Sequence, residues 1–441
     1  MEFTEKILDK CLDAGADSAE VFSLNQKKLS LTVREGRLET IQKSTPGGLA
    51  VRFFKDNKTA FAHTTDLSEK SVNEMVRTTK NMAAKTEPDE LAVLPDPGQY
   101  GRDLDIFDDS RANIPTEAKI AYLVNLEKLA MDYDILIDKS KGAWCSEVLS
   151  EIELLNSNGI KSIYKSSHYN VGISVIASKN GNMFPGEGFI SARHFSDLLP
   201  AEKIVDRYVS RALRLVGGTP VSGGDYEIIF TPYVPYTIMW GLGFALNGEN
   251  ALKGTSFLAG KKGEAFADSK LNVYDDAIKP RGVSSRPADH EGVPSQNNKL
   301  VENGVLTGYL YDTRTAARAG EKSTGSAIRD DYNANPEISP SNFYIAPGDD
   351  KTDDVIKSCK KGIMVEAVHG WGLNSVNGQY SAGINGILVR NGKMVKPVAN
   401  VTVAANAEDF FKGIGAVCDD ITFYHGFSLP TIMIKKMKVG A

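Results

Sequence analysis

Cysteine and histidine, which commonly form disulfides and zinc sites, are scarce in this 441-residue sequence, with four cysteines and six histidines. Cys11, Cys145, Cys359 and Cys418 are far apart, and none belongs to a C-x-x-C pair. The sequence therefore predicts neither a disulfide framework nor a cysteine-based zinc site. We expect the four thiols to be free and buried.

An excess of basic residues is also absent, because the formal net charge is -5. A protein that binds nucleic acid directly normally presents a basic face, so we expect no direct contact with nucleic acid. The amino terminus, MEFTEKILDKCLDAG, is amphipathic and carries charges throughout. It has neither the apolar core of a signal peptide nor a membrane span, so we expect a cytoplasmic protein that makes no membrane contact.

The composition is that of a globular protein, with 41% hydrophobic and 24% charged residues, and the length suggests two or three domains. Residues 1–85 read as a first unit of helix, antiparallel sheet and helix. Apolar residues recur at helical spacing in Phe3–Ala14 and Ser68–Lys85, with short strand-like runs between them. Proline, glycine and aspartate without periodicity make residues 86–115 a predicted linker.

Residues 116–222 form a predicted second α+β unit that packs with the first. Helical patterns over Thr116–Tyr133 and Pro200–Val216 enclose four strand-like runs, from Trp144 to His194. These runs resemble the first set in their glycine turns and alternation, so a second sheet of similar design is expected, although such signals are generic to hairpins.

Residues 223–441 are rich in strand signals, and Asn303-Gly304 and Asn391-Gly392 are strong hairpin turn pairs. We expect a mainly antiparallel β barrel or sandwich around a buried helix, with two further helices near Asp353–Lys360 and Ala407–Gly413. The predicted fold class of the whole chain is α+β.

The buried helix is assigned to Thr231–Asn250. Thr231 can cap free N–H groups, Pro232 suits the first helical position, and Asn247-Gly248 suits the end. No charged residue lies between Tyr233 and Leu246, so the helix should be buried. Replacing Phe244 by alanine should then cost roughly 3–5 kcal/mol.

A set of segments along almost the whole chain is informative as a group: GADSAEVF, GRLETIQKSTPGGLAVRFF, GTSFLAGKKGEAFA, DHEGVPSQNNKLVENGVLTGYLYDTRTAARAG, STGSAIR, NSVNGQYSAGINGILVRNGK and PVANVTVAAN. In this order the segments resemble the TldD/PmbA family, often called modulators of DNA gyrase. Each segment alone is a weak signal, but the ordered set is specific.

In the catalytic, TldD-type members, the helix at this place reads H-E-A-x-G-H-x-x-E and binds zinc. When that pattern is aligned on the shared glycine, Gly243, its four functional positions fall on Met239, Trp240, Phe244 and Asn247. Met, Trp and Phe supply neither the usual zinc ligands nor a base that could take a proton from water. The chain therefore resembles the PmbA/TldE-type subunit. We expect no catalytic residue and no metal or other cofactor in it, and zinc in a TldD-type partner.

Other histidines offer little support for a metal site. His290-Glu291 begins like H-E-x-x-H, but Pro294 and Ser295 follow where a second histidine would stand. A turn held by Asp289 and Glu291 is the better interpretation. His369 and His425 are isolated in the sequence, and a single histidine is not a site.

Gly378-Gln379-Tyr380-Ser381 is the candidate peptide-binding segment. Its glycine permits close backbone approach, and the following strand could pair with an extended peptide. An ordinary internal strand is the alternative.

The resemblance implies a non-catalytic subunit of a TldD/TldE-type metalloprotease that processes or degrades unfolded and leader peptides. Its partner would be a TldD-type catalytic subunit in a heterodimer, with a homodimer as the alternative. Two other functions stay open: a stand-alone peptidase or hydrolase with an unrecognised site, and a structural module that holds peptides.

Overall fold

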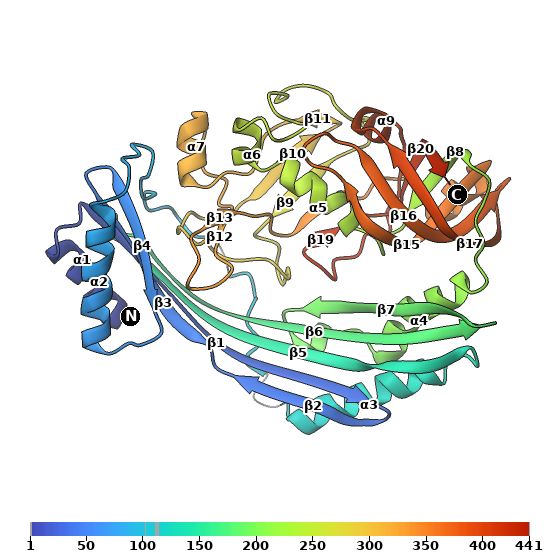
Figure 1. Ribbon diagram of the computed structural model, residues 1–441, viewed down its shortest axis with the longest axis horizontal. Coiled ribbons are helices and arrows are strands. Elements are labelled where there is room, and N and C mark those ends of the chain that lie inside the picture. The colour runs from blue at the N-terminus through green and yellow to red at the C-terminus, as the bar shows by residue number, and fades with distance from the viewer. Residues whose placement is uncertain (1, 102, 111–113, 441) are drawn as a thin grey trace.

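The structure, a computed structural model, describes residues 2–101, 103–110 and 114–440. A long curved sheet lies beneath a β-rich C-terminal domain, with helices at one end of the sheet and along it (Figure 1). This arrangement confirms the predicted α+β class. None of the described helices is long and apolar enough to cross a membrane.

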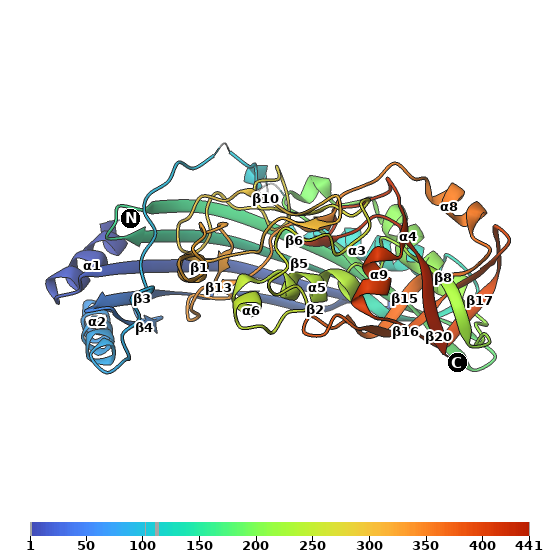
Figure 2. The ribbon, with the colours of Figure 1, turned by 90° about the horizontal axis from the view of Figure 1, so that it is seen from above.

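The long sheet is antiparallel, with the strand order β4-β3-β1-β5-β6-β7, and β2 pairs with β1 as well. Seen from above, the strands run along the length of the molecule (Figure 2). Their bounds are β1 (Ser18–Arg34), β2 (Arg37–Ser44), β3 (Gly47–Lys55), β4 (Lys58–Thr64), β5 (Ile137–Asn156), β6 (Lys161–Lys179) and β7 (Asn182–Ala192).

The expectation of two sheets is wrong, because strands from both predicted units belong to this one sheet. β1 pairs with β5 from Glu20 opposite Asn156 to Val33 opposite Ala143. β1 continues through the polar run Asn25–Lys28. Every residue of this run pairs with β5, which holds the backbone in the sheet whatever the side chains are.

Four helices cover this sheet: α1 (Glu2–Asp13), α2 (Glu69–Ala83), α3 (Thr116–Met131) and α4 (Ala201–Leu215). α1 and α2 pack at one end of the sheet, where Ile7 and Val72 share a core with Val21. α3 and α4 share a second core with β5, β6 and β7, in which Leu123 and Val209 pack with Val171. The helical period of the sequence located all four helices.

The predicted linker, residues 86–115, joins these parts, although its residues 102 and 111–113 lie outside the described ranges. Its described backbone contacts both the long sheet and the C-terminal domain. The Ser167 N–H of β6 donates to the Ile106 carbonyl at 3.0 Å, and the Arg281 N–H of the C-terminal domain donates to the Leu104 carbonyl at 2.8 Å.

The C-terminal domain contains a closed ring of five strands, because β17 pairs with β20 and completes the order β17-β16-β15-β8-β20. A second sheet has the order β11-β10-β9-β14-β19. The strands are β8 (Gly224–Phe230), β9 (Val273–Asp276), β10 (Asn297–Glu302), β11 (Val305–Leu306), β12 (Ala327–Ile328), β13 (Glu337–Ile338), β14 (Phe343–Ile345), β15 (Lys361–Leu373), β16 (Tyr380–Arg390), β17 (Lys393–Ala405), β18 (Ile414–Val417), β19 (Phe427–Ser428) and β20 (Ile432–Gly440). The helices are α5 (Tyr236–Ala245), α6 (Gly248–Leu252), α7 (Thr313–Ala319), α8 (Thr352–Ser358) and α9 (Ala407–Lys412).

The predicted barrel is confirmed, but the apolar helix is shorter than predicted and lies against β15. The hydroxyl of Thr231 donates to the Val365 carbonyl at 2.8 Å instead of capping a helix, and α5 begins after Pro235. A Cβ on Gly241 would lie 2.1 Å from the Leu373 carbonyl oxygen, so only glycine permits this close packing of helix on strand. All four cysteines are free and buried, as predicted.

Candidate functional site: a cleft between two domains

α5 is buried on one side and exposed on the other, which corrects the expectation of a fully buried helix. Ile238, Met239 and Leu242 are completely buried. Tyr236, Trp240 and Phe244 follow one another at intervals of four residues and therefore share one side of the helix. Their side chains are 44%, 44% and 46% exposed. The lack of charged residues led to the expectation of burial, whereas Tyr236 and Trp240 of this side line a cleft.

The four positions aligned with the zinc motif do not fit a zinc ion. Met239 points into the core, and Trp240 and Phe244 expose aromatic carbon. Asn247 caps α6 instead, because its side-chain oxygen accepts the Glu249 N–H at 2.9 Å. Among the described residues, no group of three or more His, Cys, Asp or Glu side chains could hold a metal ion.

The exposed side of α5 continues into a ladder of aromatic contacts. The ring of Trp240 lies 5.4 Å from that of Phe244 and 5.8 Å from that of Phe427. Tyr236 reaches Phe427 at 5.5 Å and His425 at 6.1 Å between ring centroids. Edge-to-face contacts of this kind stabilise aromatic groups that are only partly buried.

A cleft of about 540 Å³ lies between this helix and the long sheet, and we call it the aromatic cleft. Its lining comes from β7 and α4 on one side and from α5, β15 and His425 on the other. In Figure 1, β7 and α4 lie directly below β15. The volume is in the range of ligand pockets, ~300–1,000 Å³.

The aromatic cleft brings together His369 and His425, which look isolated in the sequence. His369 contacts the Asn385 amide at 3.1 Å. Burial, with a smaller effect of the Arg207 charge, lowers the pKa of His425 to about 4, so its imidazole is neutral near pH 7. Its Nδ1 atom is buried and has no hydrogen bond among the described residues.

The helix α4 contributes positive charge to the aromatic cleft. Arg211 and Arg214 both pair with Glu366 of β15, whose side chain is 1% exposed. Of the three, Arg211 lines the cleft. A buried carboxylate held by two guanidinium groups fixes α4 against β15.

The candidate peptide-binding segment lies elsewhere, beside a second cleft of about 860 Å³ that Gln379, Tyr380 and Ser381 help to line. Tyr380 is 1% exposed, and its hydroxyl lies 2.8 Å from that of Thr237. Tyr380 and Ser381 are paired with β15 on one side and β17 on the other. A peptide therefore cannot add a strand at these two residues, and any role in peptide binding, which stays a prediction, would fall to exposed Gln379 and Ser381.

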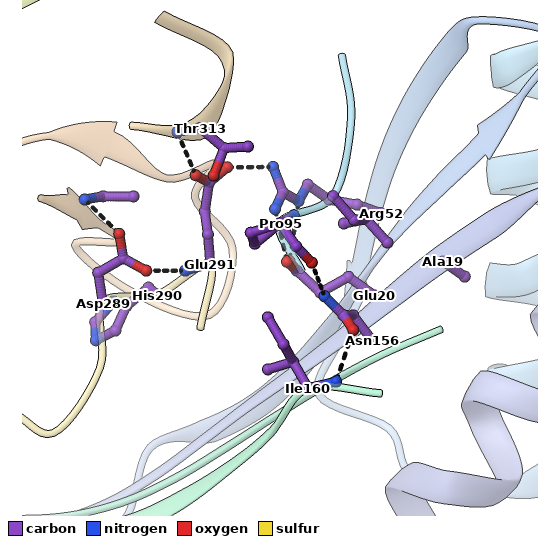
Figure 3. Close-up of polar contacts among 12 residues, drawn as sticks. Ala19, Glu20, Arg52, Pro95, Asn156, Ile160, Asp289, His290, Glu291 and Thr313 are labelled. Carbon is purple, nitrogen blue, oxygen red and sulfur yellow. Dashed lines mark hydrogen bonds and ion pairs between the residues drawn. The ribbon is translucent and has the colours of Figure 1, made fainter. Parts of the chain in front are cut away.

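Another contact between the domains consists of buried charges, and we call Glu20, Arg52, Glu291 and Arg329 the charged junction. Figure 3 shows Glu20, Arg52 and Glu291 of this group. Arg52 of β3 donates to Glu20 at 2.9 and 2.6 Å and to Glu291 at 3.0 Å. Arg329 also donates to Glu20. Each side chain is at most 11% exposed, so these charges depend on one another for stabilisation.

The predicted turn at His290-Glu291 is confirmed in part. The Asp289 carboxylate accepts the N–H groups of Glu291 and Val293, both at 2.9 Å, and so holds the turn. Glu291 instead faces Arg52 and accepts the Thr313 N–H at 2.9 Å. Burial, together with the charge of Glu291, raises the pKa of Asp289 to about 7. Burial would also raise the pKa of Glu291, but Arg52 and Thr313 lower it overall.

Comparison with known proteins identifies relatives along the whole chain. Family profiles match residues 19–83 (PmbA/TldA metallopeptidase domain 1), 109–216 (central domain) and 223–441 (C-terminal domain). The chain is 26% identical to metalloprotease PmbA of Escherichia coli O157:H7, covering 100% of this chain and 97% of the relative. It is 27% identical to the metalloprotease PmbA homolog of Haemophilus influenzae, covering 97% and 93%. The crystal structure of TldE from Thermococcus kodakarensis is similar with a TM-score of 0.89 at 23% identity, covering 100% of both chains, a likeness of fold.

Proposed function

Because the chain belongs to the PmbA/TldD family of metalloproteases, we propose that it is the non-catalytic, metal-free subunit of a TldD/TldE-type complex that processes or degrades unfolded and leader peptides. The exposed side of α5 carries the proposal. It presents Trp240 and Phe244 at two positions of the zinc motif, and neither can bind zinc or act as a base.

The partner in this proposal is a TldD-type subunit that supplies the zinc site. A chain without a metal site contributes by completing the peptide-binding surface of the complex. The exposed aromatic side of α5 supports this role, because large apolar side chains exposed together commonly mark binding surfaces. A homodimer is the alternative assembly.

The test is to mix this chain with the TldD-type subunit of the same organism and to follow cleavage of an unfolded peptide. We expect cleavage to need both chains. The double variant Trp240→Ala/Phe244→Ala should reduce cleavage by the mixture, whereas Met394→Ala/Val395→Ala should not. The control removes two side chains of similar exposure, 52% and 57%, that lie on β17 away from the aromatic cleft.

Each alternative function has its own outcome in this assay. Cleavage by this chain alone would support a stand-alone peptidase and would end the proposal. Peptide binding without any effect on the partner would support a structural module. If the partner works equally well without this chain, the subunit role is wrong.

The peptide-binding segment is best tested through Gln379→Ala and Ser381→Ala. Tyr380→Ala would remove a buried core side chain, and the resulting loss of stability would hide any effect on peptide binding.

A further inference from the structure

The aromatic cleft contains an arginine with unused hydrogen-bonding capacity. The Arg211 Nε atom lies 3.3 Å from a Glu366 carboxylate oxygen, and its Nη2 donates to the Glu366 carbonyl. Among the described residues, Nη1 of Arg211 has no hydrogen bond, although the ring of Tyr233 stacks 4.5 Å from the guanidinium. Glu366 and Tyr233 thus hold the group in place and leave one N–H-bearing end available.

A neighbouring arginine adds positive charge that no carboxylate balances. Arg207 forms no ion pair with any described acidic residue; its Nη2 donates to the Thr422 hydroxyl at 3.0 Å, and its Nε is buried without a hydrogen bond. Its guanidinium stacks on Tyr233 at 4.6 Å and Tyr424 at 4.8 Å. Of these neighbouring arginines, Arg211 and Arg214 pair with the buried acid Glu366, and Arg207 does not.

Only one acidic side chain, Glu187 of β7, is among the described residues that line the cleft. It is exposed, and its carboxylate lies 3.3 Å from the hydroxyl of Ser174. The net charge around the cleft thus favours an anion. A guanidinium group binds a carboxylate through its parallel N–H donors.

Aromatic side chains are prominent among the other residues that line the cleft. Trp240 and Tyr236 are on α5, and Phe189 is on β7. A volume of about 540 Å³ is larger than a small acid needs and suits one or two large side chains together with their backbone.

We infer that the aromatic cleft binds the carboxylate end of a peptide whose last residue is aromatic or large and apolar. The carboxylate pairs with Arg211, and the terminal side chain packs on Trp240 and Tyr236. This inference rests on the proposed function, in which the chain receives peptides, and it specifies which end of the peptide this chain holds. The aromatic side of α5 then has a defined ligand in a chain without a metal site.

The test uses the isolated full-length chain and fluorescence anisotropy, with a hexapeptide that carries a dye at its amino terminus and ends in phenylalanine. The free-acid peptide should bind about tenfold or more tightly than the same peptide with an amidated end, the loss expected for one charge-assisted contact. Replacing the terminal phenylalanine by glycine should also weaken binding. N-acetylphenylalanine should compete only at much higher concentration than the peptide.

Arg211→Gln should lower the affinity for the free-acid peptide to that for the amidated peptide. It should leave the affinity for the amidated peptide unchanged. Arg214→Gln is the matched control, because Arg214 pairs with the same Glu366 but does not line the cleft. The comparison of acid with amide on the unchanged chain needs no variant, so it decides the question even if Arg211→Gln fails to fold.

Equal affinities for the free-acid and amidated peptides would overturn the inference. Equal losses of affinity for the free-acid peptide in Arg211→Gln and Arg214→Gln would also overturn it. Competition by N-acetylphenylalanine as strong as that by the peptide would assign the cleft to small aromatic acids and overturn the peptide ligand. This assay includes no partner chain and measures no cleavage. A negative result would therefore not contradict the proposed subunit role, which the cleavage assay tests separately.

Discussion

Two of the contacts between the C-terminal domain and the long sheet differ in chemistry. At the charged junction, Glu20, Arg52, Glu291 and Arg329 are buried and each is paired. At the aromatic cleft, the rings of Tyr236 and Trp240 are nearly half exposed, and Nη1 of Arg211 has no hydrogen bond among the described residues. Both contacts join the same two parts of the chain, so the difference between them separates a contact that holds the domains from one that can receive a ligand.

Buried charges tolerate little change in geometry, because a displaced partner leaves a charge in a poorly solvated place. The charged junction therefore helps to hold the C-terminal domain in its position over the sheet, together with contacts such as that of Arg193 with the Gly282 and Ser285 carbonyls. With that position fixed, the walls of the aromatic cleft can stay apart without collapsing onto each other. We infer that the junction keeps the cleft open.

The largest expected effect comes from the charged junction. Arg329→Met should reduce the free energy of unfolding by roughly 3–5 kcal/mol, because it removes one partner of a buried carboxylate, Glu20. Urea denaturation measures this loss. The control is Lys6→Met, which breaks the exposed pair of Lys6 with Glu2 and should cost less than about 1 kcal/mol. Similar losses in both variants would show that the junction contributes no more than a surface ion pair.

The two sides of α5 give the next effect. Leu242→Ala, on the buried side, should cost about 2–5 kcal/mol. Phe244→Ala should cost only about 1 kcal/mol, because roughly half of its ring stays in water. This value replaces the larger loss expected from the sequence, which assumed a buried ring. Urea denaturation measures both losses. Equal losses of unfolding free energy in Leu242→Ala and Phe244→Ala would contradict the conclusion that one side of α5 is exposed.

The smallest effect is a pH dependence at the turn beside the charged junction. The folded-state pKa of Asp289, about 7, lies above its ordinary value of 3.8, so the folded chain binds this proton more tightly than the unfolded chain does. The group therefore costs increasing stability as the pH rises from about 4 to about 7, and the cost is constant above that. Asp289→Asn should gain stability relative to the unchanged chain over this range.

Glu291→Gln should change the free energy of unfolding with pH in the opposite direction from Asp289→Asn. The folded-state pKa of Glu291 is lowered, so its contribution to stability is present above the ordinary value of 4.5 and is lost as the pH falls through the folded pKa. Free energies of unfolding measured from about pH 2 to pH 8 for the unchanged chain and both variants would give the two difference curves, because the change due to Glu291 falls below its ordinary pKa of 4.5. Parallel curves would contradict the assignment of opposite shifts to these two carboxyl groups.

The sequence predicted those features that depend on local patterns. Helical periodicity located α1 to α4, and strand and hairpin signals together with the family resemblance predicted the β barrel. Burial of α5 was predicted from its lack of charge. Periodicity cannot show that Tyr236, Trp240 and Phe244 are nearly half exposed, since aromatic side chains occur on buried and on exposed faces alike.

Contacts between distant residues could not be predicted in this way. Glu20 and Arg329 are 309 positions apart. His369 and His425 line the same cleft only because the fold places β15 beside the segment before β19. Arg211 belongs to an ordinary amphipathic helix pattern, and its unused N–H group is defined only by the position of Glu366. Such features depend on tertiary packing, for which one sequence carries no local signal.

The central claim is that this chain is metal-free while its partner carries the zinc. The most direct measurement is elemental analysis of each chain after an active complex with the TldD-type subunit has been purified and separated. We expect about one zinc ion per partner chain and none above background on this chain. About one zinc ion retained per copy of this chain would contradict the claim.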